Sequence, residues 1–160
     1  MANQKIPTRE ECLQILINNK TPSNVIGHCK AVCKAAEEIA DNLISKGINV
    51  NRELVVAAAL LHDIERDKKD HINEGVRLLK GMGFPEIAKV IKKHSLYQID
   101  KKGIQPKTIE EKIVFYSDKR AKGSKIVSLK GRFEDLKKRY GMDFTKEMEF
   151  TKKIEKELMQ

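Results

Sequence analysis

The chain has 160 residues, of which 40% are hydrophobic and 34% charged, so it is long enough to bury a core and has a heavily charged surface. Its 32 basic and 23 acidic side chains leave a net charge of +9, which favours an anionic partner such as a phosphorylated metabolite, a nucleotide or nucleic acid. No segment approaches the roughly 20 apolar residues that span a bilayer, and the first residues are polar. We therefore expect neither a transmembrane protein nor a secreted precursor.

The cysteine pattern indicates a reducing compartment. Cys12, Cys29 and Cys33 are odd in number, and the last two are four residues apart rather than the three of a C-x-x-C pair. A disulfide framework and a zinc knuckle are both disfavoured. We interpret all three as reduced thiols in a cytoplasmic protein.

Helical periodicity covers the first half of the chain. A capping box at Thr8 and Glu11 predicts a helix of about a dozen residues. Apolar residues at spacings of three and four predict a second helix that stops at Gly47. Asn51 is expected to cap a third helix, whose residues 54–61 are all apolar, so this helix should be buried on most of its faces.

Further helices follow. Asp70 is expected to cap a fourth helix, Pro85 opens a fifth, and a second capping box at Thr108 and Glu111 opens a sixth. Residues 95–107 contain glycine and proline and are expected to form a loop.

The C-terminal region carries a weaker signal. Between residues 119 and 139 there are nine Lys or Arg residues, and two helices are expected near 131–139 and 145–159, the last capped by Thr145. No alternating run predicts a strand. The sequence thus predicts an all-α single-domain bundle of about six to eight helices. Its core comprises residues 1–120, and residues 121–160 form a basic helical extension packed on the same domain.

The four histidines and two of the aspartates stand at helix ends or on inner helix faces. They are His28, His62, Asp63, His71, His94 and Asp118. The adjacent pair His62 and Asp63 ends the apolar third helix, where two ionisable groups would lose hydration unless something neutralised them. A divalent cation would do so, since imidazole and carboxylate are common ligands of such metals. A hydrogen-bonded core histidine and a solvated or capping aspartate are the alternatives for His28 and Asp118 taken singly.

The ordered set of six resembles the HD superfamily of metal-dependent phosphohydrolases over about residues 8–120. Residues 59–66, ALLHDIER, are similar to the ALLHDIGR segment of the HDIG-type branch. Residues 71–75, HINEG, and 110–118, EEKIVFYSD, are similar to its His-x-x-x-Gly segment and its EEKIVxYAD helix. The chain departs from the branch at Glu65, which replaces a glycine, and at Ser95, which replaces the second histidine of some dinuclear members. It also lacks the GYP motif of the cyclic-di-GMP phosphodiesterases.

The resemblance implies an HD-domain bundle with one or two divalent metal ions of Fe, Mn, Mg, Co or Ni. It implies that His28, His62, Asp63 and Asp118 hold the first ion. It implies that His71 and His94 hold a second, with Asp63 shared between the two.

The implied reaction is hydrolysis of a phosphomonoester or phosphodiester bond in a nucleotide or a similar small phosphorylated metabolite, by a water molecule that the metal activates. Asp63, as the shared ligand, and Arg66 are the residues expected to act in catalysis. Arg66 is included because its planar guanidinium can hold two phosphate oxygens. Lys119 is a weaker phosphate candidate, and for both cations a solvated surface charge is the favoured alternative in a chain this rich in lysine and arginine. Glu65 is expected either to orient a ligand or to be a solvated charge.

Two other functions remain open at this point. A similar six-residue pattern holds a di-iron centre in HD-fold oxygenases such as myo-inositol oxygenase, although Ser95 stands where a second histidine would favour that reading. The chain could instead be a non-catalytic nucleotide- or nucleic-acid-binding module, with Phe133 and Tyr140 stacking on bases among the lysines. A solvated helix face with core aromatics is the favoured interpretation of that segment, so nucleic acid and membrane are disfavoured as partners. The sequence leaves the oligomeric state open.

Overall fold

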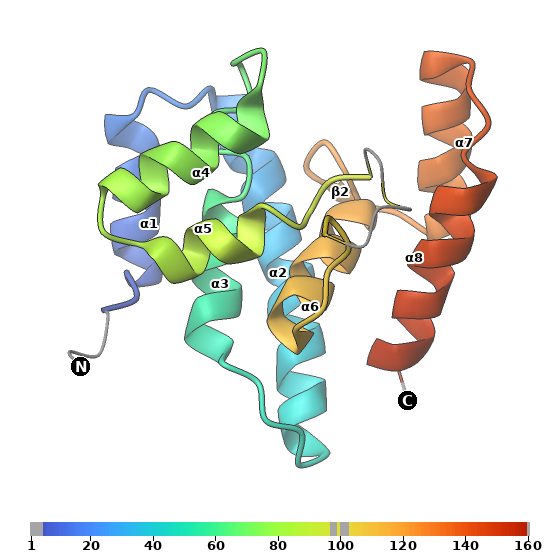
Figure 1. Cartoon of the computed structure of the whole chain (residues 1–160), viewed down its shortest axis with the longest axis horizontal. Helices are drawn as coiled ribbons and strands as arrows, with labels where there is room; N and C mark the ends of the chain where they lie inside the picture. The colour runs from blue at the N-terminus through green and yellow to red at the C-terminus, as the bar shows by residue number, and fades with distance from the viewer. Residues whose placement is uncertain (1–4, 97–98, 100–102, 160) are drawn as a thin grey trace.

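The computed structural model describes residues 5–96, 99 and 103–159, in which eight α-helices and one short β-hairpin follow one another (Figure 1). The helices are α1 (Arg9–Asn18), α2 (Ser23–Ser45), α3 (Arg52–Leu61), α4 (His71–Gly81), α5 (Pro85–Ile91), α6 (Ile109–Lys119), α7 (Leu129–Tyr140) and α8 (Thr145–Leu158). The hairpin pairs β1 (Ala121–Lys122) with β2 (Lys125–Ile126) in antiparallel register. The predicted all-α bundle is confirmed. The predicted loop at 95–107 lies partly outside the described residues.

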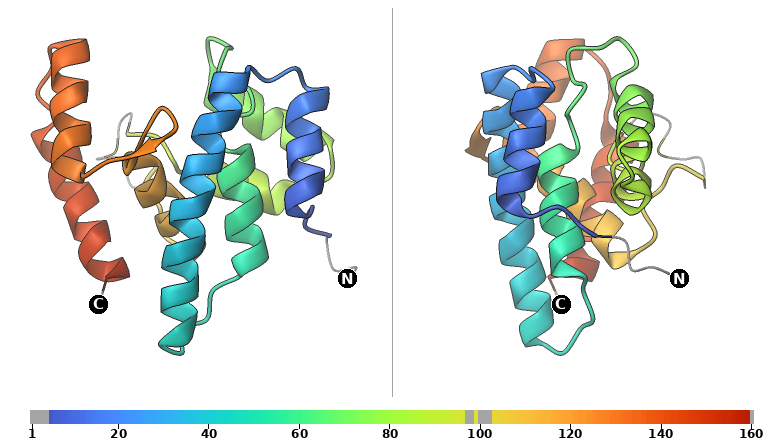
Figure 2. Two further views of the ribbon diagram at one scale, coloured as in Figure 1. Left: turned by 180° about the vertical axis from the view of Figure 1, so that it is seen from behind. Right: turned by 90° about the vertical axis from the view of Figure 1, so that its left-hand side faces the viewer.

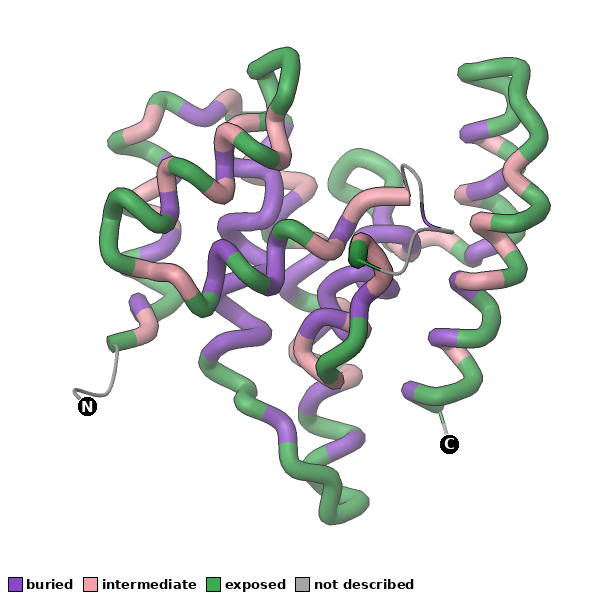
Figure 3. The backbone as a smooth tube through the Cα atoms, viewed as in Figure 1, coloured by how far each residue is buried: buried purple, intermediate pink, exposed green. Residues whose placement is uncertain are grey.

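Helix α3 forms the centre of the core. Every residue from Leu54 to Leu61 is buried, as the apolar run predicted, and α3 packs against α1, α2, α5 and α6. Figure 3 shows buried backbone concentrated in α3 and the adjoining parts of α2 and α6. Each buried valine or leucine contributes about 1.5–3 kcal/mol relative to an exposed one. Because His62 and Asp63 follow α3 directly, the same burial places them inside the bundle.

Three of the predicted helix starts have the expected side-chain caps. The capping boxes at Thr8 and Thr108 are both complete, with Glu11 and Glu111 reaching back to the cap backbone. The Asn51 side chain accepts a hydrogen bond from the backbone N–H three residues later, at 3.1 Å. Each such cap satisfies a backbone donor that the first helical turn leaves unpaired.

Two other predicted caps make no capping hydrogen bond. Asp70 stands in the cap position of α4, as predicted, but its side chain accepts from the Asn73 side chain at 3.0 and 3.2 Å instead. Thr145 is the first residue of α8, with Phe144 in the cap position, and its backbone N–H donates to Asp143 at 3.0 Å. In both places a neighbouring polar side chain offers a local hydrogen bond that competes with the cap.

The C-terminal helices lie side by side at the end of the molecule opposite α1 (Figures 1 and 2). Helix α8 packs on α6 through an edge-to-face contact of Phe115 with Phe150, whose ring centroids are 5.6 Å apart, and through an ion pair of Lys112 with Glu157 at 2.6 Å. The hairpin before α7 was not predicted, because strands of two residues carry no alternating pattern. Among the described helices, none combines the length and the apolar character that crossing a membrane requires. The domain boundary at residue 120 stays a prediction.

Candidate metal centre

The structure brings all six predicted ligand residues together from five parts of the bundle. His28 comes from α2, His62 and Asp63 follow α3, His71 opens α4, His94 follows α5, and Asp118 lies in the last turn of α6. They converge at a cavity of about 400 Å³, within the range of small-molecule sites. Five of them line this cavity, whereas His62 is buried, with 1% of its surface exposed.

The first group comprises His28, His62, Asp63 and Asp118. Each offers one ligand atom, and these four atoms lie within 4.8 Å of one another. Oδ1 of Asp118 lies 3.0 Å from Nε2 of His28 and 3.2 Å from Nε2 of His62. Oδ2 of Asp63 lies 3.5 Å from each of the same two nitrogens. Two imidazole nitrogens and two carboxylate oxygens thus surround one point.

The second group comprises Asp63, His71 and His94, whose ligand atoms also lie within 4.8 Å of one another. The oxygen that Asp63 offers here is Oδ1, which is 3.4 Å from Nε2 of His94 and 4.0 Å from Nε2 of His71. Asp63 therefore turns one oxygen to each group. This is the arrangement of a carboxylate that can bridge two ions.

Backbone carbonyls fix the orientation of three imidazoles. The Nδ1 atoms of His28, His62 and His94 each lie within hydrogen-bond distance of a carbonyl oxygen, which can only accept, so each Nδ1 carries the proton. The carbonyls belong to Gly123 at 2.9 Å, Ala59 at 2.6 Å and Ile91 at 2.6 Å, respectively. Neutral rings held in this way present the Nε2 lone pair to the centre, which is how ligating histidines are commonly held.

The electrostatics of the site fit a bound cation. Asp63 and Asp118 are buried, and Oδ1 of Asp63 accepts no hydrogen bond from any described residue. Without an ion, an Nε2 that faces Asp118 at hydrogen-bond distance must carry a second proton. Burial lowers the pKa of His62, but the charge of Asp63, the hydrogen bond with Asp118 and the neighbouring Cys29 together outweigh it, and the pKa is raised well above the usual value. A divalent cation would replace those protons and would also satisfy the unpaired oxygen.

Lys119 is not the solvated charge that the sequence favoured. Its side chain is buried, and its ammonium donates to Oδ2 of Asp118 and, at 2.8 Å, to the carbonyl of His94. Although burial opposes it, the charge of Lys119 and hydrogen bonds from His28 and His62 hold the pKa of Asp118 well below its usual range. Lys119 thus orients Asp118, so that the other oxygen faces the histidines.

Arg66 and Glu65 have different surroundings. Arg66 is exposed at the cavity, where its Nη1 donates to Nε2 of His71 at 3.1 Å. Glu65 accepts a hydrogen bond from Asn19 at 2.6 Å and holds the end of α1. It does not line the cavity, so the solvated or structural alternative describes it better than a role beside the ligands.

The sequence reasoning missed two residues that line the same cavity, Arg132 and Arg139 of α7. The available signal was their spacing: seven residues are close to two helical turns, so both side chains lie on one face. In a segment with nine basic residues that spacing did not stand out.

A helical bundle whose histidines and aspartates form two groups around one shared carboxylate is typical of a dinuclear metal-binding domain. The profile of the HD domain family matches residues 25–123, which contain all six ligand candidates. The chain therefore belongs to the HD domain family.

Three relatives illustrate the range of proteins that are similar to this chain. A protein of uncharacterised function from Methanocaldococcus jannaschii is 36% identical, over 82% of this chain and 86% of its own length. The tRNA (cytidine(56)-2'-O)-methyltransferase of Picrophilus torridus is 34% identical, over 78% of this chain and 39% of its own length. The dihydroneopterin 2',3'-cyclic phosphate phosphodiesterase of M. jannaschii is 30% identical, over 71% of this chain and 52% of its own length. The chain thus spans about half or less of the length of this methyltransferase and this phosphodiesterase. No solved structure gives a significant match.

Proposed function

We propose that this chain is a metal-dependent phosphohydrolase that cleaves a phosphomonoester or phosphodiester bond in a nucleotide or a similar small phosphorylated metabolite. The observation that carries the proposal is the sharing of Asp63 between two groups of metal-ligating side chains. Divalent cations held there would lower the pKa of a water molecule toward neutrality and offset the charge of the phosphate. Similarity to a relative named as a cyclic phosphate phosphodiesterase supports a phosphodiester as substrate.

In this proposal the first group of ligands holds one cation and the second group holds another. Asp63 can serve both because it is ionised even without an ion: burial opposes ionisation, but the charges of protonated His62 and His94 together lower the pKa of Asp63 below its usual value. Bound cations would take the place of those protons and favour the carboxylate further. The histidines contribute no negative charge, so two carboxylates face up to two dications. The resulting excess of positive charge suits a phosphate ester. The same ligand set admits Fe, Mn, Mg, Co or Ni.

Arg66 is the residue we assign to phosphate binding. It lies at the cavity, next to His71 of the second group. A guanidinium has five N–H donors in a rigid fork. The donor that faces Nε2 of His71 would be released once that nitrogen bound a cation. The donors of the fork then suit two oxygens of one phosphate group, which would fix its orientation beside the shared carboxylate.

The test is hydrolysis of bis-p-nitrophenyl phosphate and of ribonucleoside 2',3'-cyclic phosphates after loading with Mn, Mg, Co, Ni or Fe in turn. Asp63→Asn should lower kcat/KM by at least about 100-fold, since even residues that only support a metal ligand often cost that much. Asp67→Asn is the matched control, because Asp67 is exposed four residues further on and does not line the cavity. Equal activity of the two variants would contradict the proposal.

The same assay separates the two alternatives. A di-iron oxygenase would require iron and would consume oxygen, whereas a phosphohydrolase can work with Mg or Mn, which need not change oxidation state. A nucleic-acid-binding module would bind DNA or RNA with a steep dependence on salt and would hydrolyse neither substrate. We do not extend the proposal to methyl transfer, because the chain matches only 39% of the methyltransferase relative.

A further inference from the structure

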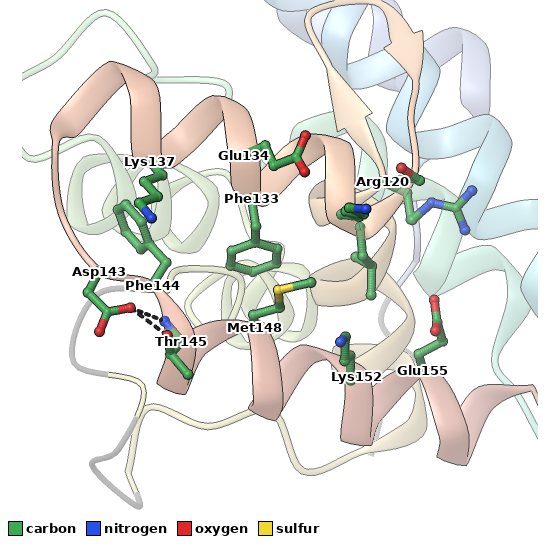
Figure 4. Close-up of a pocket in the computed structure, with 13 residues that line it drawn as sticks. Arg120, Phe133, Glu134, Lys137, Asp143, Phe144, Thr145, Met148, Lys152 and Glu155 are labelled. Atoms are coloured by element: carbon green, nitrogen blue, oxygen red, sulfur yellow. Dashed lines mark hydrogen bonds between the residues drawn. The ribbon is translucent and has the colours of Figure 1, made fainter.

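Helix α7 stands between two cavities and turns different side chains to each. The cavity between α7 and α8, about 700 Å³, has an apolar floor of Phe133, Phe144 and Met148, and Figure 4 shows Phe133 and Met148 facing each other between the two helices. Arg132 and Arg139 line the other cavity, which holds the metal-site residues. The apolar contacts on one side thus hold α7 in place, while its arginines face the candidate active site.

The two arginines form a row along the helix. They are seven residues apart, which places them on one face with a rise of about 10 Å between their backbones. Asp135 lies between them: its Oδ2 is 3.0 Å from Nη2 of Arg139 and 3.6 Å from Nη1 of Arg132. Its Oδ1 pairs with Lys122 at 2.9 Å. One carboxylate therefore faces three cationic side chains, so positive charge remains in excess on the side of the cavity that α7 lines.

Arg132 has N–H donors that are not hydrogen-bonded within the described part of the chain, because its contact with Asp135 is an ion pair at 3.6 Å, beyond hydrogen-bond distance. Its side chain is 17% exposed, and its Nε and Nη1 atoms are buried without a hydrogen-bond partner among the described residues. Buried N–H donors without an acceptor are costly, so such a group in a native structure calls for an explanation. Arg132 lines the cavity, so a small rotation of its side chain would bring these donors to an anionic oxygen bound there, and the fork of a guanidinium matches a phosphate group.

We infer that Arg132 and Arg139 form a second anion-binding subsite of the metal-site cavity. This inference rests on the proposed function and specifies its substrate as one with two anionic groups. The scissile phosphoester lies at the six ligand candidates, and a second phosphate lies against α7. Asp135 is a positioning residue that holds both arginines toward the cavity. The subsite lies on α7, outside residues 25–123 that match the HD family, so it would set specificity in this chain without changing the metal ligands.

The test compares two probes that differ only in a second phosphate: adenosine 2',3'-cyclic monophosphate and the same compound with a 5'-phosphate. For the unmodified protein, kcat/KM should favour the 5'-phosphorylated probe by about tenfold or more, mainly through KM, since one hydrogen bond to a charged group is worth about that factor. Arg132→Gln/Arg139→Gln should reduce the ratio to about one. Arg139→Gln alone, at an exposed position that should tolerate the change, should lower it part of the way.

The matched control is Lys138→Gln, which removes one positive charge from the same helix at an exposed residue that does not line the cavity. It should keep the preference. Equal loss in Lys138→Gln and Arg139→Gln would show a diffuse charge effect and would overturn the subsite.

Binding distinguishes failure of the subsite from failure of the proposed function. Calorimetric titration should show tighter binding of adenosine 3',5'-bisphosphate than of adenosine 3'-monophosphate, and the preference should vanish in the double arginine variant. That result without any hydrolysis would support the subsite and contradict the phosphohydrolase. Hydrolysis of both cyclic probes with equal kcat/KM, and no preference in binding, would overturn the subsite and leave the phosphohydrolase intact.

Discussion

Replacing Lys119 by Met should destabilise the protein strongly, because the change removes a buried charge while keeping the length of the side chain. The ammonium donates to Asp118 and to the carbonyl of His94, and its side chain is only 5% exposed. Removing one partner of a buried ion pair costs about 3–5 kcal/mol, since the other charge stays buried without compensation. Asp118 keeps its contacts with His28 and His62, so we expect the lower end, about 3 kcal/mol.

The assay is urea and thermal unfolding of protein treated with a chelator, so that metal binding does not contribute. For a chain of this size about 2–4 °C of Tm corresponds to each kcal/mol, so Tm should fall by about 6–12 °C. Lys112→Met is the matched control on the same helix, because the ion pair of Lys112 with Glu157 lies at the surface. Such pairs are worth at most about 1 kcal/mol.

A double variant sharpens the test. Asp118→Asn in the Lys119→Met background removes the uncompensated carboxylate, so the double variant should be more stable than Lys119→Met alone. The reasoning would be refuted if Lys119→Met and Lys112→Met had free energies of unfolding within about 1 kcal/mol of each other, the size of an ordinary surface pair. Lys119 would then be the solvated charge that the sequence favoured.

Two further predictions concern groups away from the metal centre. Glu37 binds Arg9 at 2.6 Å and Arg52 at 2.9 Å, and although burial opposes it, the Arg9 hydrogen bond lowers the pKa of Glu37. Its contribution is therefore present above the unfolded pKa of 4.5 and is lost as pH falls through the lower folded pKa. Glu37→Gln should cost about 1 kcal/mol in urea unfolding at pH 7 and less at pH 3, and an equal cost at both pH values would contradict this account. Burial raises the pKa of Cys12 and Cys33 to about 12, so neither thiol should react with Ellman's reagent at pH 8 until urea unfolds the protein; rapid labelling of the native protein at these positions would show the burial to be wrong.

Local signals predicted the helices well because each depends on a few neighbouring residues. The box of Thr108 and Glu111 is complete, since both partners lie within one turn. The apolar run 54–61 correctly predicted the burial of α3, because a helix that is apolar on all sides has no polar face that water could solvate. The cap position was right at Asp70 but its hydrogen bond was not, and the cap at Thr145 was wrong, because a competing polar side chain stands close in the sequence at both places.

The candidate site was predictable only in part. The motif order indicated the six ligand candidates, but their convergence depends on how five helices pack, which no local pattern contains. The pairing of Lys119 with the carbonyl of His94 joins α6 to the end of α5, and a lysine within a basic segment shows no sign of it. Arg132 and Arg139 reach the cavity because α7 folds back beside the site, so their role also depends on tertiary structure.

Element-resolved metal analysis of Asp63→Asn tests the central claim most directly, since this carboxylate alone belongs to both groups of ligand candidates. The unmodified protein and the Asp67→Asn control should hold two equivalents of a divalent metal after loading and removal of excess. His71→Gln/His94→Gln should keep one equivalent, and Asp63→Asn should lose both. Two equivalents retained in Asp63→Asn, or no metal in the unmodified protein under any loading condition, would contradict a centre built on a shared carboxylate.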